Sequence, residues 1–180
     1  MKGFNHIGIA LLLVASMAVP VAAELSERLS KDLDAAIAAD IRSEAERARD
    51  RNRRPKQTLD FFRLESDMTV IELFPGAGWY TKLLVPALKE SGRYIAVDGL
   101  GKALGFGPNL GAVRQIDGFE DVEIVDVSEA FSMGPRRGMM NFAEMDFGLD
   151  EVDMALTFRN LHNFTPEARV NLYASVHDAL

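Results

Sequence analysis

The chain has 180 residues, no cysteine and a net charge of −7. Without cysteine it has no disulfides, thiolate metal ligands or cysteine nucleophile. The acidic balance argues against a nucleic-acid binder or a protein of anionic membrane surfaces, so we expect no nucleic-acid partner. After residue 23 only His162 and His177 remain as histidines, which excludes a His-rich metal site, and we expect no metal.

Residues 1–23 have the pattern of a secretory signal peptide. Lys2 is a short basic start, an apolar run of about 13 residues follows, and small residues precede a cleavage point between Ala23 and Glu24. The run is shorter than the roughly 20 residues that a membrane-spanning helix needs. An uncleaved N-terminal anchor is the alternative. We therefore expect a periplasmic or secreted protein with no stable membrane insertion after cleavage.

Residues 24–64 are predicted to form a helical extension. Apolar side chains recur at four-residue spacing, as on one face of an amphipathic helix, at Leu25, Leu29, Leu33, Ile37 and Ile41. Pro55 would end this helix, and a second short helix is expected over residues 57–64. The basic cluster at residues 47–54 is interleaved with acidic and amide side chains. We interpret it as a solvated helix face rather than a phosphate site.

From residue 68 onward, predicted strands and helices alternate, and residues 65–180 form the second predicted domain. Strands are expected over residues 69–73, 93–97, 121–125 and 152–158, and helices over residues 79–90 and 165–180. Thr165 is the expected cap of the last helix, with Pro166 at its first position. Residues 99–109 and 130–146 are expected to be loops, the second with at most a short helix. This order predicts an α/β fold with a parallel, doubly wound Rossmann-like sheet.

The fourth predicted strand would lie at an edge of that sheet. Its residues 152–158 carry an apolar face, and an exposed apolar edge strand is an aggregation hazard. We therefore expect the domain to be truncated after the fourth strand, or another segment to cover that edge.

The stretch VIELFPGAGWYT, residues 70–81, is the most informative motif. A strand runs through a turn with Gly76 and Gly78 into a helix, and those glycines let the backbone approach a ligand closely. The following helix N-terminus favours a carboxylate or phosphate. Asp98 ends the second strand twenty residues after Gly78, where dinucleotide folds place an acceptor for ribose hydroxyls. A turn-forming or capping role is the alternative for Asp98.

The motif is not that of a dinucleotide enzyme. The G-x-G-x-x-G fingerprint requires a third glycine at position 81, which is Thr81. A nicotinamide-dependent oxidoreductase is therefore the weakest alternative. A ligand with one ribose, an adenine and an amino-acid tail fits better.

The same stretch resembles the glycine motif of class I S-adenosylmethionine-dependent methyltransferases. Residues 49–84 are similar to a family of predicted bacterial methyltransferases that often carry export signals. The segment VDMALTFRNLHNF, residues 152–164, resembles that family's fourth strand and its Arg-Asn-x-His signature. The resemblance spans roughly residues 47–180. Such chains continue into a Gly-Gly turn, a fifth strand and an antiparallel hairpin, so it implies that this chain is part of a longer one.

The resemblance assigns roles residue by residue. It implies that S-adenosylmethionine is the cofactor, that Glu72 orients its methionine ammonium group and that Asp98 holds its ribose. Gly76 and Gly78 would admit the methionine tail, and Asp126 would contact the adenine. Phe74 stands where the superfamily usually has glycine.

Further candidates flank this cofactor site. Trp79 and Tyr80 are candidates for lining the methionine pocket, with core packing as the alternative. Arg159, Asn160 and His162 follow the fourth strand, at the edge where open α/β sheets bind ligands.

Methyl transfer is an in-line displacement in which positioning supplies much of the rate. A histidine that titrates near neutral pH suits the role of general base, although His162 could instead be satisfied by backbone groups. We expect methyl transfer to a small-molecule acceptor. The alternative is an exported, non-catalytic ligand-binding domain on the same fold.

Overall fold

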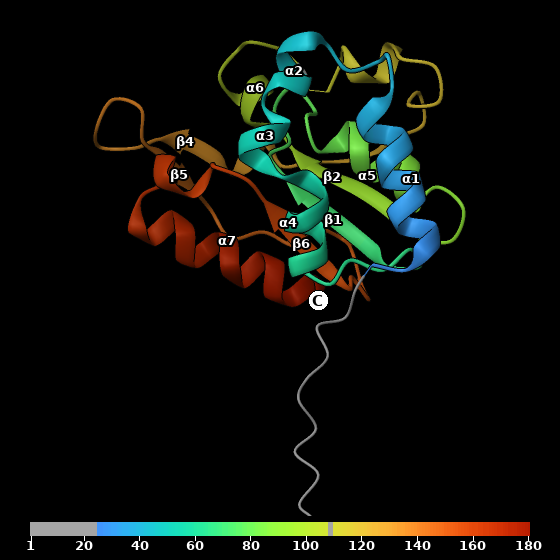
Figure 1. Ribbon diagram of the computed structural model, residues 1–180. Coiled ribbons are helices and arrows are strands. Elements are labelled where there is room, and N and C mark those ends of the chain that lie inside the picture. The colour runs from blue at the N-terminus through green and yellow to red at the C-terminus, as the bar shows by residue number, and fades with distance from the viewer. Residues whose placement is uncertain (1–24, 108–109) are drawn as a thin grey trace, which may run out of the picture.

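The computed structural model describes residues 25–107 and 110–180. The predicted signal peptide lies outside these residues. At the centre of the described part is a parallel sheet in the order β3-β2-β1-β6 (Figure 1). Its strands are β1 (Thr69–Leu73), β2 (Arg93–Asp98), β3 (Glu123–Asp126) and β6 (Met154–Thr157). The predicted α/β architecture with a parallel sheet is confirmed, and this strand order is compatible with a Rossmann-like fold.

The two central strands are apolar because helices or a hairpin cover both faces of the sheet. Side chains alternate along β1, so Val70 and Glu72 lie on one face while Ile71 and Leu73 lie on the other. Glu72 is in register with Ala96 on β2. An acidic side chain is therefore buried at the centre of the sheet, close to the carboxyl ends of its strands.

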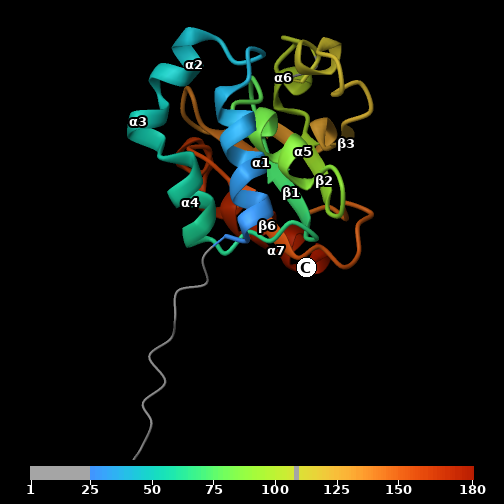
Figure 2. The ribbon, with the colours of Figure 1, turned by 45° about the vertical axis from the view of Figure 1, so that its right-hand side comes forward.

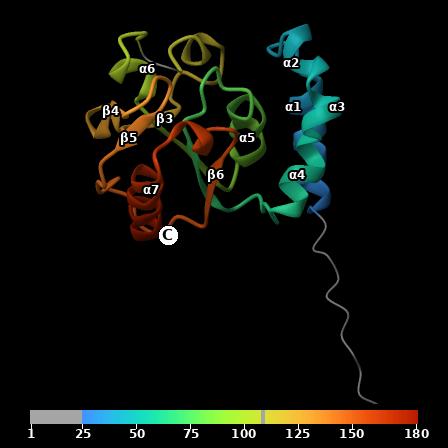
Figure 3. The same cartoon turned by 90° about the vertical axis from the view of Figure 1, so that its left-hand side faces the viewer.

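Helices α1 (Glu27–Ala38) and α5 (Thr81–Leu88) cover one face. Helix α1 packs against α5, and Figure 2 and Figure 3 show the whole extension outside α5. Leu29 and Leu33 of α1 are fully buried there with Leu83 and Leu84 of α5. The extension is thus an additional layer of the domain.

Helix α7 (Pro166–Ala179) and an antiparallel pair, β4 (Phe131–Met133) and β5 (Met140–Phe142), cover the opposite face. The Thr165 hydroxyl accepts a hydrogen bond from the Ala168 amide at 3.2 Å, so the predicted cap of α7 is confirmed. The prediction of a loop over residues 130–146 was wrong. Phe131 and Phe142 pair across β4 and β5 and pack on Phe74 from the end of β1.

The prediction of one long helix up to Pro55 was also wrong. The extension contains α1, α2 (Glu44–Ala48), α3 (Asp50–Arg53) and α4 (Pro55–Phe61). The chain turns after α1 because Ser43 and Glu46 form a capping box that starts α2. Ile41 consequently leaves the apolar face and is 36% exposed, while Ala36 is buried. The second predicted helix starts at Pro55 rather than at residue 57.

Other boundaries differ by a few residues. Helix α5 begins at Thr81, because residues 76–80 form a turn, and ends at Leu88. Strand β3 includes Asp126, which was expected just beyond it. The predicted loop at residues 99–109 contains the short helix α6 (Leu100–Ala103). Three 3-10 helices complete the described elements, namely η1 (Val113–Gln115), η2 (Ser128–Ala130) and η3 (Leu161–Asn163).

Strand β6 forms one edge of the sheet, as expected, and β3 forms the other. Met154, Ala155 and Thr157 of β6 are half-buried. None of the helices in the described part of the chain has the length and apolar character needed to span a bilayer.

Candidate functional site

The site is built around Glu72, which is only 3% exposed. Thr81 at the start of α5 donates to Glu72 Oε2 at 2.9 Å, and Tyr94 on β2 donates to the same oxygen at 2.7 Å. Both hydroxyls use Oε2, so Oε1 has no hydrogen-bond partner among the described residues. One carboxylate oxygen is thus fixed by the protein and the other is available to a ligand.

Burial controls the charge of this carboxyl group. It raises the pKa of Glu72 to about 7, even though the hydrogen bonds from Tyr94 and Thr81 favour the ionised form. The nearby Asp98 charge raises it further. Burial and the adjacent Glu72 also raise the pKa of Tyr94 well above its ordinary value, so the phenol stays a donor. Glu72 therefore changes charge near neutral pH, and a ligand cation would favour its ionised form.

The turn after β1 has a left-handed backbone at both of its glycines. Phe74, Gly76 and Gly78 all adopt positive φ, at 56°, 62° and 74°. A Cβ on Gly76 would meet nothing within 4 Å, whereas a Cβ on Gly78 would lie 2.6 Å from Cγ2 of Val113. Gly78 is therefore required by packing as well as by backbone conformation. The Gly76 backbone borders open space.

This difference gives a prediction. Gly78→Ala should lower the free energy of unfolding by about 2–4 kcal/mol, because left-handed strain adds to overpacking against Val113. Gly76→Ala is the matched control, with the same strain but no clash, and should cost about 1 kcal/mol. Urea denaturation of the two variants measures both values. Equal costs would show that the contact with Val113 does not constrain residue 78.

Asp98 ends β2 and is buried, and its Oδ1 accepts a hydrogen bond from the Gly99 amide at 2.7 Å. It borders a cavity of about 250 Å³ whose other lining residues are Gly99, Lys102, Leu110, Arg114, Ile124 and Asp126. Leu110, on this wall, also lies 3.3 Å from a Cβ on Gly78, so the glycine turn and the cavity adjoin. The structure therefore brings Gly78, Asp98 and Asp126 together.

Asp126 lies in register with Asp98 and is half-exposed. It forms an ion pair with Lys102 of α6 and accepts a hydrogen bond from the Ser128 amide at 2.9 Å. The hydrogen bond from Lys102 lowers the pKa of Asp126 to about 2, and the bonds from Ser128 add to this effect. Asp126 is thus ionised at neutral pH. A ligand that binds to its carboxylate would do so beside the ion pair with Lys102.

Trp79 and Tyr80 face the helical extension. The Trp79 indole donates to the backbone carbonyl of Glu46 at 3.0 Å. The Tyr80 ring stacks on Phe158, with ring centroids 3.6 Å apart and planes 14° apart. Both side chains belong to the core between α5 and the extension. They join the turn after β1 to α2 and to the end of β6.

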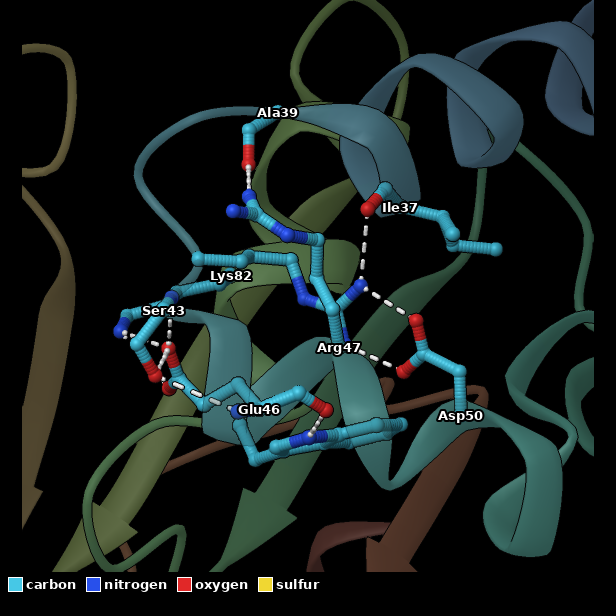
Figure 4. A network of polar contacts seen from close by, with 9 residues as sticks. Ile37, Ala39, Ser43, Glu46, Arg47, Asp50 and Lys82 are labelled. Atoms are coloured by element: carbon cyan, nitrogen blue, oxygen red, sulfur yellow. Dashed lines mark hydrogen bonds and ion pairs between the residues drawn. The ribbon is translucent and has the colours of Figure 1, made fainter.

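A polar network holds this junction together (Figure 4). Glu46 bonds to Ser43 of its own capping box and pairs with Lys82 of α5 at 2.8 Å. Arg42 is fully buried, donates to the Ile37 carbonyl and pairs with both carboxylate oxygens of Asp50, at 2.6 and 3.0 Å. The Glu46 contacts with Lys82 and Trp79 thus fix the extension to the sheet domain through partly buried polar bonds as well as apolar packing, while the Arg42–Asp50 pair holds the extension itself together.

The three residues predicted after β6 lie at the same sheet edge as Glu72, because β6 pairs in parallel with β1. Asn160 donates to the backbone carbonyls of Leu73 and Phe74, at 3.2 and 3.3 Å, and so ties β6 to the turn. Arg159 has a positive φ of 65° and is exposed. His162 is exposed in η3, and within the described residues its ring has no hydrogen-bond partner.

Sequence reasoning did not identify the two donors to Glu72. The glycine motif marks Thr81 only as the residue in place of a third glycine, and it does not include Tyr94. The alternation along β2 could have found Tyr94, because it shares with Glu72 the sheet face that α5 covers. The interpretation of the basic cluster as solvated is correct for most of it but wrong for Arg53, which is half-buried over aromatic rings.

No family model matches the chain, and neither a curated protein nor a solved structure matches it significantly.

Proposed function

We propose that the chain binds S-adenosylmethionine and transfers its methyl group to a small acceptor. One observation carries the proposal: two buried carboxylates, Glu72 and Asp98, lie at the carboxyl ends of neighbouring parallel strands beside a left-handed glycine turn, and Asp98 lines a cavity of about 250 Å³. Ligands of open α/β sheets bind at this edge. Small-ligand pockets usually measure ~300–1,000 Å³, so this smaller cavity fits one nucleoside better than a dinucleotide.

The residues present fit the parts of this cofactor. Glu72 Oε1 would accept the ammonium group, Asp98 would accept the ribose hydroxyls, and Leu110 and Ile124 would pack on the adenine. The open side of Gly76 would leave room for the methionine tail. The bound sulfonium supplies an activated methyl group, which moves to the acceptor as the S–C bond breaks and the acceptor loses a proton.

Calorimetry with S-adenosylhomocysteine tests the proposal. The wild type should bind, and Asp98→Ala should weaken binding on the order of 10- to 100-fold, because a hydrogen bond to a charged group contributes about 1.5–3 kcal/mol. Asp121→Ala is the matched control, since Asp121 is exposed and lies outside the cavity lining. A wild type that shows no binding heat at high micromolar ligand would remove the basis for the proposal.

A non-catalytic binding domain on the same fold is the second candidate. Two observations favour it. The exposed imidazole of His162 has no partner among residues 25–107 and 110–180, whereas a general base normally has an orienting partner. The amide of Asn160 bonds to backbone carbonyls and so has a structural role. Transfer of a tritiated methyl group to any acceptor in a broad screen would select the enzyme. Ligand binding without transfer would select the binding domain.

A further inference from the structure

Arg53, at the end of α3, is a cation for which the described part of the chain supplies no counter-ion. Its guanidinium carbon lies 4.5 Å from the centroid of the Trp79 ring and 5.8 Å from that of Tyr80. The side chain is half-buried, and no carboxylate of the described residues lies within ion-pair distance of it. Burial lowers the pKa of Arg53, and the charges of Arg49 and Arg159 lower it further. Burial and two neighbouring positive charges thus disfavour the charged form of the Arg53 guanidinium.

A neighbouring arginine shows how the fold balances such a charge elsewhere. Arg42 also lies over the Trp79 ring, at 5.0 Å, but it is paired with both carboxylate oxygens of Asp50. The same network, centred on Glu46 in Figure 4, fixes α2 and Trp79 and so places Arg53. Arg53 lies over the same indole ring as Arg42, but no carboxylate of the described residues pairs with it.

A second cation follows the same aromatic stack in the chain. Phe158 stacks on Tyr80, and the next residue, Arg159, stands in a left-handed conformation at the end of β6. Among the described residues Arg159 has no acidic partner either. The positive charge of Arg159 also lowers the pKa of Arg53. Both lie at the edge of the sheet where β1 and β6 end.

We propose that Arg53 and Arg159 together bind a ligand carboxylate, so that the helical extension completes the ligand site. A guanidinium fork matches a carboxylate in a bidentate geometry, and the aromatic faces of Trp79 and Tyr80 hold the fork in plane. The charge of Glu72 also reaches Arg53, which favours a singly charged carboxylate over a phosphate dianion. The role of this carboxylate in methyl transfer rests on the proposed function. The carboxylate is either that of the donor's amino-acid tail or that of the acceptor.

The test uses Arg53→Gln and Arg159→Gln, with Arg51→Gln as the matched control, because Arg51 lies on the same helix and is exposed. Calorimetry compares S-adenosylhomocysteine with 5′-methylthioadenosine, which has the same nucleoside but no amino-acid tail. Benzoate serves as a separate carboxylate probe. Its binding is followed by the fluorescence of Trp79, the only tryptophan of the chain.

If the carboxylate belongs to the donor, Arg53→Gln and Arg159→Gln lower the affinity for S-adenosylhomocysteine at least tenfold and leave the affinity for 5′-methylthioadenosine unchanged. If it belongs to the acceptor, both nucleosides are unaffected and the benzoate response is lost in the two variants but kept in Arg51→Gln. A benzoate response that depends on Arg53, in a wild type that binds no S-adenosylhomocysteine, would support the carboxylate site while removing the proposed function. Binding of S-adenosylhomocysteine that is equal in all variants, with no benzoate response, would overturn the carboxylate site alone.

Discussion

Glu72→Gln should weaken S-adenosylhomocysteine binding about 10- to 100-fold and yet stabilise the ligand-free protein at pH 8. The first effect follows because an amide cannot form the charge-assisted bond to the ligand ammonium, which contributes about 1.5–3 kcal/mol. The second follows because the amide replaces a carboxylate that is buried, and whose ionised form is therefore penalised. A site that costs stability in order to bind is expected at a functional position.

The stability effect has a defined dependence on pH. The pKa of Glu72 is about 7 in the folded protein, against an ordinary value of 4.5. Below pH 4.5 the Glu72 carboxyl is protonated in both the folded and the unfolded state, so the protonated group contributes its full share to the stability of the folded protein. As the pH rises from 4.5 to 7 the unfolded chain ionises first, and this contribution is lost. The loss amounts to about 3 kcal/mol above pH 7, at 1.36 kcal/mol per pH unit.

Urea denaturation at pH 4.5, 6 and 8 measures this difference. The stability gain of Glu72→Gln over the wild type should be near zero at pH 4.5 and on the order of 3 kcal/mol at pH 8. Calorimetry between pH 5.5 and 7.5 should show wild-type affinity falling about tenfold per pH unit below 7, and little change in the variant. Glu167→Gln, at an exposed position of α7, should follow the wild type in both experiments. Identical pH profiles for Glu72→Gln and the wild type would contradict the assignment.

The sheet could be predicted because its signals are local. Strands β1 and β2 are short apolar runs that end at turns, and the cap at Thr165 marks the start of α7. The break in the extension could not be read from periodicity, since the four-residue spacing continues through Ile41. The competing signal was the Ser43–Glu46 capping box. Strands β4 and β5 are too short to show alternation, and aromatic contacts with the distant Phe74 hold them in place.

The candidate site could be predicted only in part, because some of its residues are placed by local signals and others by contacts between distant parts of the chain. Glu72, Asp98 and the glycines lie in one strand-turn-helix-strand unit, so their spacing places them at one edge. The positions of Trp79 and Arg53 depend on contacts between the extension and the turn after β1, which are 26 or more residues apart in the chain. No local pattern distinguishes the inward-turned Arg53 from the exposed arginines beside it.

Phe74→Ala should lower the free energy of unfolding by about 3–5 kcal/mol, the usual cost of removing a buried phenylalanine ring. Phe74 is 4% exposed, and its ring centroid lies 5.4 Å from those of Phe131 and Phe164. It is the side chain that joins the end of β1 to the β4–β5 pair and to the segment before α7. Urea denaturation measures the loss, and a change below 1 kcal/mol would show that this aromatic cluster contributes little.

Phe74→Gly should be less destabilising than Phe74→Ala, by about 1 kcal/mol, because residue 74 has a φ of 56° and only glycine adopts that conformation without strain. Elsewhere the order is reversed, since glycine gains more freedom than alanine in the unfolded chain. Phe142 on β5 has no positive φ and packs in the same cluster, so it is the matched control, and there Gly should cost more than Ala. If Gly is less destabilising than Ala at residue 74 but more destabilising at residue 142, the effect of backbone strain is separated from that of ring packing. This result would also show that the chain keeps a strained phenylalanine at the ligand turn because its ring holds that turn to the opposite face of the sheet.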